Sequence, residues 1–391
     1  MDNERTVRIG DPDATVVLTD PDRTVRIGQQ LIVPAQRPAT LVVAAAVRRP
    51  VPAAPPRPQW TRLLRNVDLT QVVCWQVAVL AAVLAAGRPM PVLLGAIATA
   101  AVLGGLTAVR VRGRWGYQLV GAGLRFLLRA KRHELPEPAA LIEVLLPGST
   151  VRTVPTGPDE LPAISHAHGL TAVLRPVGAL PEPGTLLPAV EEPQVLGVQA
   201  VFHTGANRDA PVEAWLAVHA ARTVEDGLDG ELTLLLHNAL RRVRRSLRRA
   251  GVHAEAPRED MLFAGIAELA HVTRKLREDW GFVRSGPVSQ ACFALDGWDR
   301  LPAAEATRLV PEVHARTGGV LATLTLSARS HPRGTRTRAV LRLAAPTEFA
   351  VDHTAIGVAG LLGPAGVGLV RLDGDHLAGL AASLPIGGFP T

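Results

Sequence analysis

Two acidic residues near the C-terminus have the spacing of a metal-binding pair. Asp373 and Asp375 in "LDGDHL" form an Asp-x-Asp sequence, and in many nucleotide-sugar transferases such a pair holds a divalent metal against the diphosphate. Aspartate and glycine are also common in turns and at helix N-termini, so the same letters are typical of a turn followed by a helix. The turn is the preferred interpretation, and a membrane-tethered, glycosyltransferase-like enzyme using Asp373 and Asp375 is the alternative.

Other motifs that could support catalysis or metal binding are incomplete. His166 and His168 in "HAH" would project from one face of a strand, but no third ligand follows at a recognisable spacing. Residues 363–368, "GPAGVG", lack the ending of a phosphate loop and predict a glycine-rich loop before a strand. The sequence contains no Gly-x-Ser-x-Gly, His-Glu-x-x-His or Walker motif. We therefore expect a scaffold with no catalytic residue, metal or cofactor.

The densest charge in the chain lies in "ELTLLLHNALRRVRRSLRRA", within a predicted helix at residues 229–250. Cations near the end of a helix suit its dipole, and the leucines occupy the other face. The arginines predict either a solvated surface or a docking surface for an acidic lipid or protein partner. No aromatic residues are interleaved with them, so nucleic acid is not an expected partner. The candidate docking residues are Arg241, Arg242, Arg244, Arg245, Arg248 and Arg249.

Three nine-residue units repeat at the N-terminus: "DNERTVRIG", "DPDATVVLT" and "DPDRTVRIG". Each places an acidic residue before a threonine and an aliphatic residue three positions after it. This pattern is typical of a bacterial Ser/Thr kinase substrate whose phosphothreonine binds a forkhead-associated domain. Three copies would raise the local concentration of docking sites, although short repeats also arise by slippage. The candidate phosphorylation sites are Thr6, Thr15 and Thr24.

The elements that must position these residues fall into three regions. Residues 1–58 combine the repeats with a proline-rich linker and predict a disordered cytoplasmic tail. Residues 59–132 predict a transmembrane hairpin and a basic exit helix, and residues 133–391 predict a cytoplasmic, mixed α/β (α+β) domain. The chain has 391 residues, 47% of them apolar, which is enough for a large core. Its two cysteines, Cys74 and Cys292, do not form a disulfide framework.

Two apolar runs predict a pair of membrane spans. Residues 67–86 and 89–109 both provide the roughly 20 residues that a helix needs to cross the hydrocarbon core, and a short turn around Arg88 separates them. A cleaved signal peptide does not fit two such runs far from the N-terminus, and a buried soluble pair would need a large surrounding protein. Gln71 and Gln76 could bond either to the second span or to another membrane helix.

Positive charge flanks both ends of the hairpin, whereas its turn carries one arginine. The positive-inside rule therefore predicts a multi-pass protein of the plasma membrane with both termini in the cytoplasm. The segment 114–133 continues as a basic helix whose arginines suit anionic lipid head groups. The alternative is that this segment is the first helix of the soluble domain. A net charge of +7 also suits an anionic partner.

Short alternating segments after Pro136 predict strands, and longer periodic segments predict helices. Because the two types interleave, we expect packed α and β layers. The predicted strands are 141–146, 170–177, 194–203, 212–222, 282–295, 320–329, 337–345 and 367–372. The predicted helices are 229–250, 258–272, 302–315, 348–362 and 374–383.

This layout resembles the EccE family of actinobacterial type VII secretion systems. The resemblance covers residues 60–388 and rests on the two spans, "GRWGYQLVGAGLRFLLRAKRH", "EAWLAVHAAR", "ELTLLLHNALRRVRRSL" and "VRLDGDHLAGLAASLPIGG". It implies a non-catalytic membrane subunit that stabilises the secretion pore beside the other membrane subunits of the complex. Members of that family carry no established catalytic residues, so none is transferred. The repeats before residue 60 are not part of the resemblance.

Overall fold

The structure is a computed structural model that describes residues 16–20, 23–27, 69–111, 114–155, 160–187, 195–207, 211–223, 229–330 and 334–387. The chain divides into two units, Met1–Val67 and Asp68–Thr391. In the first unit, strands β1 (Val16–Asp20) and β2 (Arg23–Ile27) pair antiparallel. The rest of the predicted tail, 1–58, lies outside the described residues.

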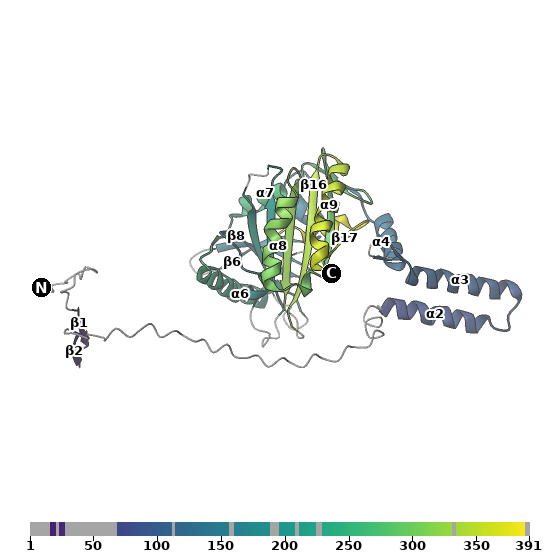
Figure 1. Ribbon diagram of the computed structural model, residues 1–391, viewed down its shortest axis with the longest axis horizontal. Coiled ribbons are helices and arrows are strands. Elements are labelled where there is room, and N and C mark those ends of the chain that lie inside the picture. The colour runs from purple at the N-terminus through teal and green to yellow at the C-terminus, as the bar shows by residue number, and fades with distance from the viewer. Residues whose placement is uncertain are drawn as a thin grey trace. The chain divides into compact units, whose positions relative to one another are not determined.

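Two apolar helices begin the second unit. Helices α2 (Leu69–Ala85) and α3 (Met90–Ala108) lie side by side (Figure 1). Gln71 donates from Nε2 to the carbonyl oxygen of Thr107 (3.1 Å), and the indole of Trp75 donates to the Thr107 hydroxyl (3.0 Å). Gln71 therefore bonds within the helix pair, whereas the side chain of Gln76 is exposed.

Only one of the two predicted spans is supported by length and composition. Within the described part of the chain, α3 is the one helix long and apolar enough to cross a membrane. The apolar part of α2, Gln71–Ala85, is shorter than the span predicted at residues 67–86. Most large apolar side chains of both helices are exposed, among them Val79, Val83 and Leu94.

The basic segment after α3 forms a helix that packs on the α/β domain. A short turn made by β3 (Arg110–Val111) and β4 (Arg114–Trp115) leads into α4 (Gly116–Leu128). The ring of Phe126 meets that of Trp280 edge to face, with centroids 5.4 Å apart. Lys131 lies 4.5 Å from the centroid of the same Phe126 ring. The predicted helix within residues 114–133 is present, and its C-terminal end is joined to the domain.

A single 13-stranded sheet forms the centre of that domain. Its order is β5-β12-β13-β14-β16-β15-β9-β10-β8-β7-β6, with β11 paired to β8 and β17 paired to β14, and the neighbouring strands run antiparallel. The strands are β5 (Arg132–Glu134), β6 (Thr150–Pro155), β7 (Glu160–His166), β8 (Gly169–Val177), β9 (Leu196–Thr204), β10 (Glu213–Ala221), β11 (His253–Glu255), β12 (Lys275–Glu278), β13 (Val283–Ser285), β14 (Val288–Asp296), β15 (Leu321–Arg329), β16 (Arg336–Ala345) and β17 (Gly368–Arg371).

Helices cover both faces of this sheet. Side chains of successive strand residues point to opposite faces, so Leu216 of β10 joins the core under α6 while Trp215 joins the core under α7. Helices α8 and α9 cover β14, β15 and β16 on the face that α6 occupies (Figure 1). The helices are α5 (Ala139–Leu145), α6 (Asp229–Arg249), α7 (Glu259–Ala270), α8 (Ala303–Arg316), α9 (Glu348–Leu362) and α10 (His376–Ala382), with short 3-10 turns at Pro183–Leu186, Trp298–Arg300 and Gly363–Ala365.

Most predicted elements occur, and the mixed α/β class is confirmed, but two predicted strands differ. Of the predicted strand at 141–146, residues 141–145 lie in helix α5, which buries Leu141 and Ile142 in the core shared with α7 and α10. Residues 282–295 form two strands, β13 and β14, separated by a turn at Gly286, whose φ is +55°. Five strands of the domain sheet were not predicted: β5, β6, β7, β11 and β12.

Candidate functional site

The sequence "LDGDHL" forms a turn that leads into α10, as its preferred interpretation predicts. The N–H group of Gly374 donates to the carbonyl oxygen of Trp280 (2.7 Å), and Gly374 has a φ of +73°. A Cβ atom at this position would lie 2.4 Å from the Trp280 ring. Both the backbone conformation and the close ring contact therefore require glycine here.

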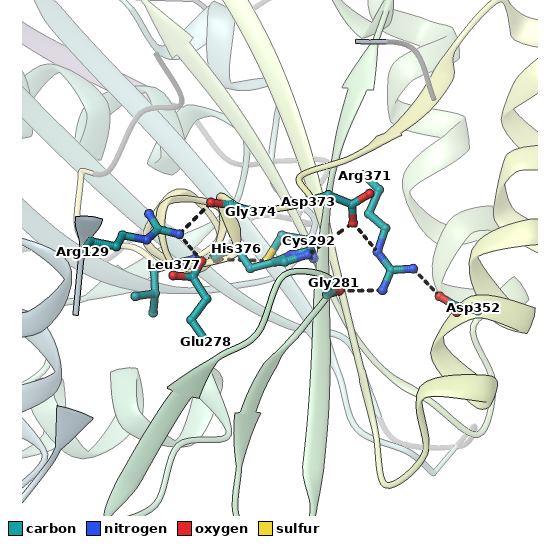
Figure 2. A network of polar contacts seen from close by, with 10 residues as sticks. All are labelled: Arg129, Glu278, Gly281, Cys292, Asp352, Arg371, Asp373, Gly374, His376 and Leu377. Atoms are coloured by element: carbon teal, nitrogen blue, oxygen red, sulfur yellow. Dashed lines mark hydrogen bonds and ion pairs between the residues drawn. The ribbon is translucent and has the colours of Figure 1, made fainter. Parts of the chain in front are cut away.

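Arginine side chains neutralise both aspartates of this turn. The buried Asp373 lies 3.1 Å, through Oδ1, from Nε of Arg371 (Figure 2). Asp375 lies 3.5 Å from Arg129 and 3.6 Å from Arg125. No group of three or more His, Cys, Asp or Glu side chains that could hold a metal occurs among the described residues. The carboxylates of Asp373 and Asp375 are thus engaged by cations of the protein itself.

Glu278 connects the end of α4 to the start of α10. Its side chain is completely buried at the end of β12 and forms an ion pair with Arg129, the residue after α4. The N–H group of Leu377, in the first turn of α10, donates to Glu278 Oε1 (2.9 Å). Arg129 also donates to the carbonyl oxygen of Gly374 (2.8 Å), as Figure 2 shows. Burial raises the pKa of Glu278, although the Leu377 hydrogen bond and the Arg129 charge oppose this shift.

A cysteine, a histidine and an aspartate meet in this network, but not in the geometry of a nucleophilic site. The backbone N–H of Cys292 donates to Nδ1 of His376 (3.2 Å), and Nε2 of the same ring lies 3.8 Å from Asp373. The sulfur of Cys292 contacts the carbonyl oxygen of His376 (3.7 Å) rather than the ring. Burial raises the pKa of the Cys292 thiol to about 12, so the thiol stays protonated near neutral pH.

A buried arginine, Arg342, connects the C-terminal end of α7 to strands β14 and β15. Arg342 of β16 donates to the side-chain oxygens of Gln290 (2.7 Å) and Thr323 (3.0 Å) and to the carbonyl oxygen of Leu269. Leu269 lies in the last turn of α7, where backbone carbonyls lack helical partners and attract cations. Within the described residues, no carboxylate lies within ion-pair distance of Arg342. Burial lowers its pKa to about 10. The one arginine in the apolar run "AVLRLAA" was a signal for this position.

Three buried histidines lie in the interior of the domain, and two of them, His203 and His271, are close to Arg342. His203 lies 3.0 Å through Nδ1 from the Thr323 hydroxyl, and its ring centroid lies 5.0 Å from that of His271. Burial lowers the pKa of His203 to about 4 and that of His271 to about 3. On the opposite face of the sheet, burial likewise lowers the pKa of His314, on α8, to about 4. All three imidazoles are therefore neutral at pH 7.

The pair His166 and His168 does not share a strand face. Strand β7 ends at His166, which is buried, while His168 lies exposed in the turn that follows. Their ring centroids are 5.8 Å apart. The glycine-rich 363–368 segment forms a 3-10 turn before β17, as predicted.

The six predicted docking arginines lie on α6, and all of its leucines except the exposed Leu234 are buried against the sheet. Four of the six line a groove of about 820 Å³ together with residues of β7 and β11. These four are Arg241, Arg244, Arg245 and Arg248. Arg242 and Arg249 are exposed on the same helix but do not line the groove.

The structure describes one of the three candidate phosphorylation sites. Thr6 and Thr15 lie outside the described residues, and Thr24 lies in β2, opposite Thr19 of β1. Their phosphorylation and binding to a forkhead-associated domain stay predictions.

The fold and these sites define a mixed α/β domain built on a large antiparallel sheet. An ionic network joins this domain to helix α4, which follows the exposed apolar helix α3. In the described part of the chain, Asp373, His376 and Cys292 contact one another or their neighbours within the protein, and no three His, Cys, Asp or Glu side chains are grouped as metal ligands. The chain matches no family model and no curated protein.

Proposed function

We propose that this protein is a non-catalytic, multi-pass membrane subunit of a type VII-like secretion complex, as the resemblance to the EccE family implies. In this role, α2 and α3 cross the plasma membrane, both termini face the cytoplasm, and the α/β domain is a cytoplasmic scaffold. The other membrane subunits of the complex and anionic lipid head groups are its partners.

The apolar stripe on α4 is the observation that carries this proposal. Four large apolar side chains of α4 are more than half exposed, and their spacing places them on one side of the helix. They are Val120, Leu124, Leu127 and Leu128. The residues that join α4 to the domain, Phe126 and Arg129, lie between and after them. An apolar stripe next to basic residues is typical of a helix lying in a membrane interface.

The surfaces of α2 and α3 support the same role. Their exposed valines and leucines form a large apolar surface, which is unusual for a protein surrounded by water. The hydrogen bonds from Gln71 and Trp75 to Thr107 hold the two helices together in the way that polar groups join membrane helices. A 17-residue α2 can cross a bilayer that thins locally or through flanking residues that extend toward the head groups.

The ionic network gives the proposed scaffold a mechanical role. Arg129 follows directly after α4 and is anchored by Glu278 and Gly374 of the domain. A displacement of the membrane helices is therefore transmitted to β12 and α10 rather than absorbed by a loose linker. The transferase alternative lacks this support, because Asp373 and Asp375 are already paired with arginines.

Cysteine labelling tests the proposed topology. With Cys74 replaced by alanine and Cys292 buried, a single cysteine is introduced in separate variants as Asn3→Cys, Arg88→Cys or Arg249→Cys. An impermeant maleimide added to intact cells is expected to label only the Arg88→Cys variant. Labelling of Asn3→Cys in intact cells would show that α2 does not span, and labelling of Arg249→Cys would contradict a cytoplasmic domain.

Co-purification tests the proposed assembly. The protein is extracted from its native cells in mild detergent, and the proteins that stay bound are identified by mass spectrometry. Several other integral membrane proteins are expected in stoichiometric amounts. A monomeric species without partners would contradict the scaffold role. Activity with a nucleotide sugar that is lost in Asp373→Ala would instead support the transferase.

A further inference from the structure

Four arginines of α6 share one groove. Arg241, Arg244, Arg245 and Arg248 follow one another at steps of three, one and three residues, which places them along one strip of the helix. The groove measures about 820 Å³, and its remaining lining comes from Leu247 of α6, from strands β7 and β11 and from the chain around these strands. That lining is mostly small or apolar and consists of Leu161, Leu247, Val252, Ala254 and Ala256, with Glu160, His253 and Glu255 beside them.

The four guanidinium groups have no counter-ions of their own. Within the described residues, none of these four arginines is within ion-pair distance of a carboxylate. Nε of Arg244 is buried and makes no hydrogen bond. Glu255, which lies in the same groove, pairs with His253 at 3.2 Å. Elsewhere in the domain arginines are paired, as Arg371 with Asp373 and Arg129 with Glu278, so this strip is an uncompensated positive surface.

The strands beside the groove leave room for a further extended segment. Strand β8 pairs with β7 between Gly169 and Ala172, and with β11 between Arg175 and Val177. Strands β7 and β11 therefore pair with different parts of β8. Beyond its pairing with β8, β7 contributes Glu160 and Leu161 to the groove, opposite β11. Among the described strands, β11 pairs only with β8. A strand with one open edge can accept a peptide by hydrogen bonds between backbones.

We propose that this groove binds an extended acidic segment of a partner protein. In an extended chain, alternate side chains on one face are roughly 6.6 Å apart, close to the roughly 5–6 Å between neighbouring positions on one helix face. Glutamates at alternate positions therefore meet successive arginines, while the small residues between them lie against Ala254 and Ala256, which are partly exposed in the groove. A single phosphate would occupy only a fraction of the groove and leave its apolar floor uncovered.

Fluorescence anisotropy with the full-length protein in a neutral detergent tests this proposal. The probe is a labelled twelve-residue peptide of alternating glutamate and valine, and the control peptide has glutamine in place of each glutamate. Arg245→Glu removes a groove arginine, and Arg249→Glu is the matched control, because both residues are exposed on α6 and only Arg245 lines the groove. Urea unfolding of both variants confirms that they fold equally well.

The acidic peptide is expected to bind in a salt-dependent manner. Arg245→Glu should weaken its binding by about tenfold or more, and Arg249→Glu by less than about twofold, since charge reversal acts most strongly on close contacts. Equal effects of both substitutions, or equal binding of the glutamine peptide, would overturn the proposal. So would displacement of the peptide by micelles containing phosphatidylglycerol but not phosphatidylcholine, because that result assigns the groove to lipid.

Discussion

Removing the charge of Arg129 is expected to destabilise the contact between the end of α4 and the α/β domain. The substitution Arg129→Ala leaves the carboxylate of Glu278, which has no exposed side-chain surface, without its cation. Breaking a buried ion pair in this way costs about 3–5 kcal/mol. Arg129 is itself 28% exposed, so we expect the lower end of that range. A loss of about 3 kcal/mol lowers the folding equilibrium constant by roughly two powers of ten.

The pH dependence separates this effect from a simple loss of packing. The folded-state pKa of Glu278 is raised above the ordinary glutamate value of 4.5, so the group contributes most favourably below pH 4.5, and that contribution is lost as pH rises through the folded pKa. Arg129 opposes the upward shift, and its removal therefore raises the pKa of Glu278 further. The cost of Arg129→Ala should be largest at pH 8 and smallest near pH 4.5.

Urea unfolding of the full-length protein in detergent, followed by tryptophan fluorescence, measures this cost. Arg125→Ala is the control, because Arg125 is 70% exposed and contacts Asp375 only at 3.6 Å, and such a pair contributes under about 1 kcal/mol. In the double variant Arg129→Ala, Glu278→Gln, part of the stability should return, since no buried charge is left unpaired and the amide oxygen still accepts from Leu377. If Arg129→Ala costs no more than Arg125→Ala at pH 8, the reasoning is refuted.

Three further predictions concern buried polar groups and close packing. Gln71→Leu should weaken the contact between α2 and α3 by roughly 0.5–1.5 kcal/mol, measured by unfolding in detergent, because it removes the hydrogen bond to Thr107. Gln76→Leu, on the exposed side of α2, should cause no such loss. A similar loss of stability in both variants would contradict this assignment. Acid should destabilise the domain, because three buried histidines have lowered pKa values and contribute to stability as neutral imidazoles above pH 6.5. This contribution is lost as pH falls toward 4, and the loss is on the order of 1–2 kcal/mol per group by pH 5. The groups concerned are His203, His271 and His314, and a urea midpoint that does not fall between pH 7 and pH 5 would exclude this linkage. Gly379→Ala should lower the stability of the fold by about 1–3 kcal/mol in a thermal unfolding assay, because the added Cβ would lie 2.5 Å from Cβ of Cys292. Gly360→Ala is the control: its added Cβ would have no atom within 4 Å, so this substitution should be neutral or stabilising in the same assay.

Features that depend on neighbours in the sequence were predicted well. Helix α6 follows from the spacing of its leucines and arginines, and β8, β9, β10, β15 and β16 follow from their alternation and turn residues. The turn at Gly374 follows from the letters "LDGD", since aspartate and glycine favour that backbone conformation locally. Residues 141–146 show the limit, because a short apolar run fits a strand or a buried helix equally well.

By itself, the sequence determined the apolar helices, the arginine strip on α6 and most of the secondary structure, because periodicity and turn chemistry are local. Only the tertiary structure decided which charges meet. Arg129 and Asp375 are 246 positions apart, and Glu278 gave no sign in the sequence that it would be buried against Arg129. The groove likewise exists only because β7 and β11 part beside α6. Such contacts join distant segments, and their energies depend on burial, which no local pattern specifies.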